Sequence, residues 1–231
     1  MSSFQLAYVP IGVPTFELVS AGEQFEKSKK MLRALCADTV CPDEMLLSVD
    51  KLTAFLDGLS PDLIVLQNIT FANSAYVSEV LKRFDCPILL WTLREPVIDG
   101  GRLRLNSLTG AFSAANTIKY FRKEQFGYVF GSPEEKSVIA ETGAYIRAAQ
   151  VRKELKSLKM ASVGHTPQGF GFGRALDAEL LKSFGVTLES IEARELIEKA
   201  QAYSEDDARE YLERAAKSMN GLEKTPEKNA L

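Results

Sequence analysis

Short runs of consecutive apolar residues alternate with longer amphipathic segments along this chain. The most continuous runs are LIVL at 63–66 and PILLW at 87–91, and each gives way to polar residues. A strand buried on both faces has such a continuous apolar sequence, and parallel sheets contain strands of this kind. The pattern therefore predicts parallel strands with helices on both faces.

The first two thirds of the chain alternate between predicted strands and predicted helices. Strands are expected at 5–11, 63–67, 87–91 and 127–131, with a weaker one within 37–49 that Cys41-Pro42 interrupts. Helices are expected at 16–35, 50–59, 73–84 and 110–121. This alternation favours an α/β fold with a flavodoxin-like or Rossmann-like parallel sheet.

A second cycle begins after a long helix expected at 132–156, with Ser132 as N-cap and Pro133 in its first turn. Strands at 159–163 and 186–191 follow, with helices at 174–184, 193–202 and 205–219. The chain thus divides into an N-terminal α/β domain, 1–155, and the opening βαβα part of a second one, 156–231. Two strands do not form a stable sheet by themselves, so the second domain is expected to be unfinished: either the chain is a fragment, or a partner completes the half-domain.

Polar residues follow the two most apolar strands, where a ligand site of an open α/β sheet would lie. They are Gln67, Asn68, Thr70, Trp91, Arg94 and Glu95. Most are uncharged, which suits a sugar better than a phosphate. Trp91 could stack on a sugar ring or belong to the core. Glu95 could be a catalytic carboxylate or the ion-pair partner of Arg94.

Further along, Asn106, Ser107 and Asn116 flank a predicted helix start, where helix capping and ligand binding explain them about equally well. A glycine-rich segment with Gly164, Pro167, Gly169 and Phe170 could shape a ligand cleft or form a simple turn. It matches neither G-x-G-x-x-G nor a P-loop. Glu189 and Glu192 lie near the distance expected of a ribose-binding acid, so a nucleotide site stays an alternative.

Composition narrows the class of protein. The 231 residues include 28 basic and 31 acidic side chains, a formal charge of −3, which shows no bias toward nucleic acid. Cys36, Cys41 and Cys86 favour reduced thiols and, with no apparent signal peptide or membrane span, a cytoplasmic protein without a membrane partner. His165 is the only histidine, so no histidine cluster for a metal is expected.

The segments LQNITFANS, PILLWTLREP, GGRLRLNSLTGAFSAAN and YVFGSPEE resemble the N-terminal domain of the L-fucose isomerase-like proteins, relatives of L-fucose and L-arabinose isomerases. GHTPQGFGFGRALDAELLKSFGV resembles the opening of that family's second domain. The resemblance implies a three-domain aldose–ketose isomerase that works through an enediol as a homo-oligomer, with a divalent metal, commonly Mn²⁺.

The resemblance also implies where the chemistry lies. The metal ligands and catalytic residues of such enzymes are expected beyond Leu231, so this chain alone is expected to hold no metal and to be inactive. In this family the N-terminal domain of a neighbouring subunit helps to bind the sugar. The substrate-binding residues implied here are Gln67, Asn68, Thr70, Phe71, Glu95 and Asn106, with Trp91 added from its place at a strand end.

Two alternatives stay open at this point. One is a non-catalytic, two-lobed protein that binds or senses a sugar. The other is a nucleotide-binding α/β module.

Overall fold

The computed structural model describes residues 4–122 and 126–218. Contacts divide the chain into two units, Met1–Glu154 and Leu155–Leu231, and each is described by itself. The polar end of the chain, 219–231, in which the second domain is expected to break off, lies outside the described residues.

Unit 1 contains a parallel sheet in the order β1-β2-β3-β4. Its strands are β1 (Leu6–Ile11), β2 (Leu63–Asn68), β3 (Ile88–Thr92) and β4 (Gly127–Phe130). Isolated parallel bridges join Val40 to Ala7 and Leu46 to Ile11 on the free side of β1. The weak strand predicted within 37–49 is reduced to these bridges, because Pro42 between them has no N–H to donate. The predicted α/β fold with a parallel sheet is confirmed.

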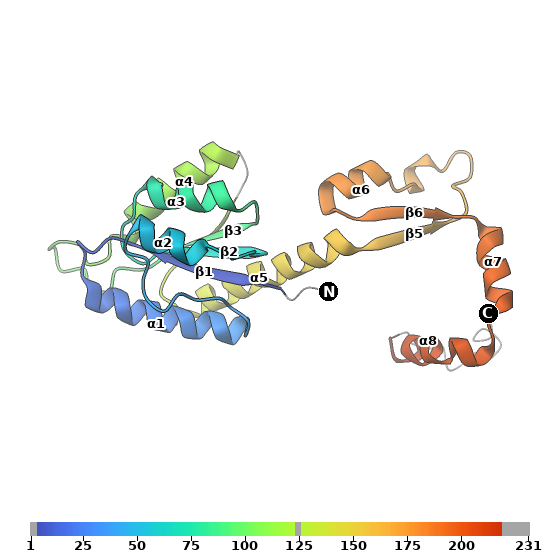
Figure 1. Ribbon diagram of the computed structural model, residues 1–231, viewed down its shortest axis with the longest axis horizontal. Coiled ribbons are helices and arrows are strands. Elements are labelled where there is room, and N and C mark those ends of the chain that lie inside the picture. Colours follow the sequence, from blue (N-terminus) through green and yellow to red (C-terminus); the bar gives the residue numbers. More distant parts are fainter. Residues whose placement is uncertain (1–3, 123–125, 219–231) are drawn as a thin grey trace. The chain divides into compact units, whose positions relative to one another are not determined.

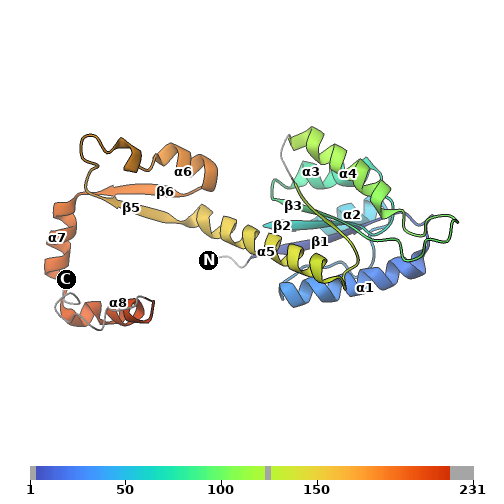
Figure 2. The same ribbon diagram turned by 180° about the vertical axis from the view of Figure 1, so that it is seen from behind.

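Helices cover both faces of this sheet (Figures 1 and 2). On one face, α1 (Leu18–Leu35) and α5 (Lys136–Ser157) pack through Phe25, Leu32 and Ile146. On the other face lie α2 (Val49–Leu56), α3 (Ser74–Arg83) and α4 (Ser107–Arg122), shown in cyan to yellow-green in Figure 1. All residues of β1, β2 and β3 are buried, which explains the continuous apolar runs LIVL and ILLW that open β2 and β3.

Three predicted helix boundaries in unit 1 are wrong by three residues or more, and the first is the end of α2, which lies at Leu56 rather than at 59. The helix α4 begins at Ser107 rather than at 110. The helix α5 begins at Lys136 rather than at 132, because Ser132 and Pro133 belong to a turn that the Glu135 amide closes by donating to the Ser132 carbonyl, 3.0 Å.

The strand order of unit 1 reverses between β1 and β2. From β1 the chain passes through α1 to the segment around Val40, on one side of β1, and then returns through α2 to β2 on the other side. This is the flavodoxin-like order, and in such sheets ligands bind outside the carboxyl ends of the strands at the point of reversal. The fold therefore directs attention to the loops after β1 and β2.

Unit 2 pairs β5 (Lys159–Val163) with β6 (Thr187–Ile191) in parallel. A short 3₁₀ turn, η1 (Gly171–Gly173), and three helices complete its described part: α6 (Asp177–Phe184), α7 (Ala193–Ala202) and α8 (Glu205–Ser218). Helix α6 begins three residues later than predicted. Within 155–218 the only buried apolar side chain is Val186, while Phe184 and Leu181 are more than half exposed. The described part of unit 2 thus buries almost no core of its own.

Candidate functional site

Three loops meet at the carboxyl ends of β1, β2 and β3, and we call them the strand-end rim: residues 12–17, 69–73 and 93–106. Figure 1 shows the loops after β1 (blue) and β3 (green) projecting from the same edge of the sheet. The Val13 amide donates to Thr70 Oγ1 at 3.0 Å, and the Phe71 amide donates to the Leu105 carbonyl at 2.9 Å. The Glu17 amide donates to the Arg104 carbonyl at 3.0 Å. These bonds tie the three loops into one surface.

The first rim loop needs a glycine at its start. A Cβ atom on Gly12 would lie 2.5 Å from Thr70 Oγ1 and 3.0 Å from a methyl of Ile69. No other residue type lets the loops after β1 and β2 approach this closely.

The carboxylate of Glu95 closes the third loop on itself. Its Oε2 accepts from the amides of Arg104 and Leu105, at 3.0 and 3.1 Å, and its Oε1 accepts from the amide of Asn106. Arg94 does not pair with Glu95, so that predicted ion pair is wrong. Both carboxylate oxygens are engaged by main-chain donors, and Glu95 holds the shape of the loop.

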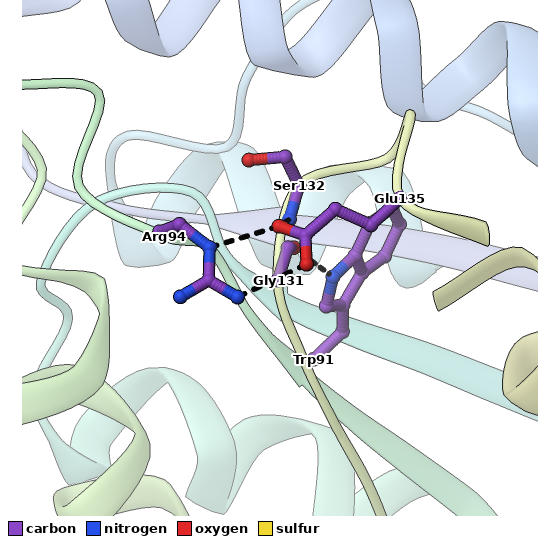
Figure 3. Close-up of polar contacts among 5 residues, drawn as sticks. All are labelled: Trp91, Arg94, Gly131, Ser132 and Glu135. Carbon is purple, nitrogen blue, oxygen red and sulfur yellow. Dashed lines mark hydrogen bonds and ion pairs between the residues drawn. The ribbon is translucent and has the colours of Figure 1, made fainter. Parts of the chain in front are cut away.

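Arg94 instead joins the third rim loop to the turn before α5 (Figure 3). Its Nε and Nη2 donate to the two oxygens of Glu135 at 2.9 and 3.0 Å, and Glu135 also accepts from the Ser132 amide at 2.7 Å. The hydrogen bonds from Arg94, and then that from the Ser132 amide, lower the pKa of Glu135 to about 2. Glu135 therefore stays ionised throughout the physiological range.

Four of the predicted substrate residues are fully buried: Gln67, Asn68, Thr70 and Trp91. Gln67 accepts from the Tyr8 hydroxyl and donates to Ser28 Oγ at 3.1 Å, beneath α1. Burial raises the pKa of Tyr8 well above its ordinary value, so Tyr8 remains a neutral donor. Trp91 Nε1 donates to the Gly131 carbonyl at 3.0 Å, so the indole belongs to the core in this chain (Figure 3).

Asn68 is buried differently. Neither its amide nitrogen nor its amide oxygen has a hydrogen-bond partner among the described residues. The side chain lies against α4, where a Cβ on Gly110 would come within 2.5 Å of Asn68 Nδ2. An unpaired buried amide is costly, which makes Asn68 a strained position below the rim.

Thr70 and the remaining predicted substrate residues lie in the rim itself. Thr70 is buried and accepts a hydrogen bond from the Val13 amide, whereas Phe71 and Asn106 are half-buried. The ring of Phe71 lies 6.2 Å from that of Phe16, centre to centre. Asn106 has a positive φ of 51°, a conformation that asparagine tolerates, and its Oδ1 accepts from Thr109 Oγ1 at 2.7 Å. The structure brings these residues together, and their contact with a substrate stays a prediction.

The glycine-rich segment belongs to unit 2, whereas the rim belongs to unit 1. Gly164 and Gly169 have φ values of 74° and 87°, which favour glycine, and Phe170 is 56% exposed. Pro167 accepts a main-chain bond from Phe170 at 3.2 Å, which closes a turn. The predicted role of these residues in a cleft stays a prediction.

A pocket of about 340 Å³ lies at the opposite, amino edge of the sheet, lined by Leu63, Ile88, Tyr145, Arg152 and neighbouring residues. It lies away from the rim and contains none of the predicted site residues. Among the described residues, no three histidine, cysteine, aspartate or glutamate side chains lie close enough to hold a metal ion. The residues present therefore do not fit the divalent metal implied by the resemblance. In the same part of the chain, no helix is both long and apolar enough to cross a bilayer.

Among the charged residues of this region that were not predicted as site residues are Glu135 and Arg102. Glu135 follows Ser132 by three residues, the spacing of a capping box, and this signal could have indicated its bond to the Ser132 amide. Arg102 follows Gly100-Gly101, and nothing in its sequence neighbours indicates that it reaches Thr15 and Phe16 in the loop after β1.

Fold and site together define an α/β protein of flavodoxin-like strand order with a polar, cross-linked rim at the carboxyl edge of its sheet. The chain is 60% identical over 229 residues, 99% of its length, to a sulfoquinovose isomerase of Clostridium sp. (strain MSTE9). It is 35% identical over 98% of its length to a sulfoquinovose isomerase of Priestia aryabhattai, and 31% identical over 86% to one of Alkalicoccus urumqiensis.

The chain spans about half the length of the curated relatives it matches, 51%, 51% and 45% respectively. No family model matches it. The relatives carry the name of a sugar isomerase, the kind of enzyme implied by the resemblance, but none of those named here is a fucose or arabinose isomerase.

Proposed function

We propose that this chain is part of a sulfoquinovose isomerase, an enzyme that converts an aldose bearing a sulfonate into the corresponding ketose. The observation that carries the proposal is 60% identity over 99% of the chain to a relative of that name. The strand-end rim supports it, because a rim of amide, hydroxyl and aromatic groups suits the hydroxyls and apolar faces of a sugar.

The proposed reaction moves the carbonyl from C1 to C2. A base removes the proton from C2, an enediol forms, and a proton returns to C1, so that no external oxidant or reductant is needed. We assign none of these proton transfers to the described residues. Their proposed part is to bind and orient the sugar, and the proposed assembly is a homo-oligomer in which the rim faces a neighbour's catalytic centre. The chain alone is then inactive.

The metal in this proposal lies elsewhere in the whole enzyme. A divalent ion such as Mn²⁺ can polarise the sugar carbonyl and the neighbouring hydroxyl when bound. The whole enzyme should lose activity in a chelator and recover it with Mn²⁺. Residues 1–231 alone should show no stoichiometric Mn²⁺ site in equilibrium dialysis.

The test is an NMR assay of the whole enzyme with sulfoquinovose, with L-fucose and L-arabinose as comparison substrates. The expected result is ketose formation from sulfoquinovose at a kcat/KM at least about tenfold above that for either comparison sugar. In D₂O the enediol route should place solvent deuterium on the carbon that receives the proton. If the enzyme prefers L-fucose or L-arabinose, the proposed substrate is wrong and that sugar takes its place. A protein that isomerises none of the three would contradict the isomerase function itself.

A further inference from the structure

Arg102 is held in the strand-end rim by contacts that leave its charge unpaired. Its Nη2 donates to the main-chain carbonyl of Thr15 at 3.2 Å, and its guanidinium carbon lies 5.0 Å from the centre of the Phe16 ring. Phe16 in turn lies against Phe71. The guanidinium is thus positioned by the loops after β1 and β2, although its own residue belongs to the loop after β3.

The carboxylates of this region are already engaged by other donors. Glu17 accepts from the amides of Val19 and Ser20 at the start of α1, at 2.8 and 2.9 Å. Glu95 accepts from three amides of its own loop, and Glu135 is paired with Arg94. Asp99 accepts from the Gly101 amide at 2.9 Å and lies 4.0 Å from Arg104. Within the described part of the chain, Arg102 forms no ion pair. The surface therefore presents a fixed positive charge without a counter-charge.

The other arginines that could contact a ligand are less suited to bind an anion. Arg94 already uses two donors on Glu135, and Arg104 lies 4.0 Å from Asp99. Arg174 follows the glycine-rich segment of unit 2, and no described contact fixes its guanidinium. An arginine that is already ordered loses less conformational entropy on binding than one that must be ordered by the ligand.

We infer that Arg102 binds the sulfonate group of the substrate and so determines its specificity, an inference that rests on the proposed function. A guanidinium has five N–H donors, of which the contact with Thr15 uses one. A sulfonate offers three acceptor oxygens and a permanent negative charge, so a planar guanidinium can donate to two of them at once. The relatives are named for a sulfonated sugar, and Arg102 is the fixed, unpaired cation of the rim.

The test compares R102Q, R102K and the control R33Q in the whole enzyme. Arg33 is an exposed arginine near the end of α1, so R33Q removes the same charge from the same unit without touching the rim. The measurements are KM and kcat for sulfoquinovose, the inhibition constant of quinovose, which is the same sugar without the sulfonate, and the melting temperature.

R102Q should raise KM for sulfoquinovose about 10- to 100-fold, the usual effect of losing charge-assisted hydrogen bonds. Its kcat and the inhibition constant of quinovose should stay within about twofold of wild type. Its melting temperature should fall by about 2–4 °C at most, because the contacts with Thr15 and Phe16 are exposed and therefore weak. R102K should lie between R102Q and wild type, because lysine keeps the charge but not the two-pronged donor. R33Q should match wild type.

Two results would overturn the inference. An unchanged KM in R102Q would mean that the sulfonate is bound elsewhere. A parallel loss for sulfoquinovose and quinovose, with a lower melting temperature, would mean that Arg102 only supports the loops. If the wild-type enzyme isomerises sulfoquinovose, either result leaves the proposed function intact. If the wild-type enzyme neither isomerises nor binds sulfoquinovose, both the proposed function and the inference about Arg102 are overturned.

Discussion

Replacing Glu95 by glutamine separates two roles of a carboxylate beside a sugar site: a catalytic base and a clamp on the loop that carries it. The structure favours the clamp, since both oxygens accept main-chain amides of residues 104–106. A glutamine oxygen can replace Oε2 toward Arg104 and Leu105. Its NH₂ group then faces the Asn106 amide, where donor meets donor.

The cost follows from these contacts. Hydrogen bonds to a charged acceptor contribute about 1.5–3 kcal/mol each, against about 0.5–1.5 for neutral ones. Losing one such bond at this half-buried site, and weakening two, should destabilise the protein by about 2 kcal/mol. For unit 1, a domain of about 150 residues, that lowers the temperature of its melting transition by about 4–8 °C.

The assay is thermal melting of the whole enzyme together with steady-state kinetics. E95Q should melt earlier and raise KM, because the rim is less ordered, while kcat falls less than about tenfold. The matched control is E141Q on the exposed face of α5, which should leave both quantities unchanged. A loss of kcat by about 10³ or more, with KM and melting temperature as in wild type, would refute the clamp and indicate general acid–base catalysis.

Three further changes test the neighbouring contacts. W91F removes both the donor to the Gly131 carbonyl and part of a fully buried ring system, and should cost about 2–3 kcal/mol in urea unfolding; a cost below about 1 kcal/mol would contradict the buried, hydrogen-bonded indole. E135Q should lower the free energy of unfolding by less than about 1 kcal/mol above pH 4.5, because the pair with Arg94 is partly exposed. This difference from wild type should shrink as the pH falls toward 2, where Glu135 becomes protonated. A difference that stays constant from pH 6 to pH 2 would contradict this. N68L removes an unpaired buried amide and should raise the melting temperature; a fall would show that the amide is satisfied.

The strands of unit 1 could be predicted from sequence because burial on both faces leaves a direct signature. The wholly apolar runs LIVL and ILLW lie in β2 and β3. The sequence predicted the edge segment near Val40 only as a weak strand, because Pro42 interrupts its pairing with β1. The meeting of the loops after β1, β2 and β3 at one edge also followed, because parallel strands end at one edge; their role as a substrate site stays a prediction.

The partners of the site residues could not be predicted in the same way. Arg94 and Glu95 are adjacent, but successive side chains of an extended segment point in opposite directions, so neighbours in sequence are poor candidates for an ion pair. The true partner of Arg94, Glu135, is 41 positions away. The burial of Trp91 was equally hidden, because only the pairing of β3 with β4 shows that Trp91 lies opposite Val129, inside the sheet.

The bonds from Glu95 to residues 104–106 give the third rim loop two ends that are fixed to each other. The residues between them, 96–103, include the exposed Ile98 and the cation Arg102, and they carry none of the sheet. The length and charge of such a segment can change while the sheet and the hydrogen bonds of Glu95 are kept. Selectivity for a charged substituent on the sugar could then evolve, or be engineered, by replacing one short surface segment.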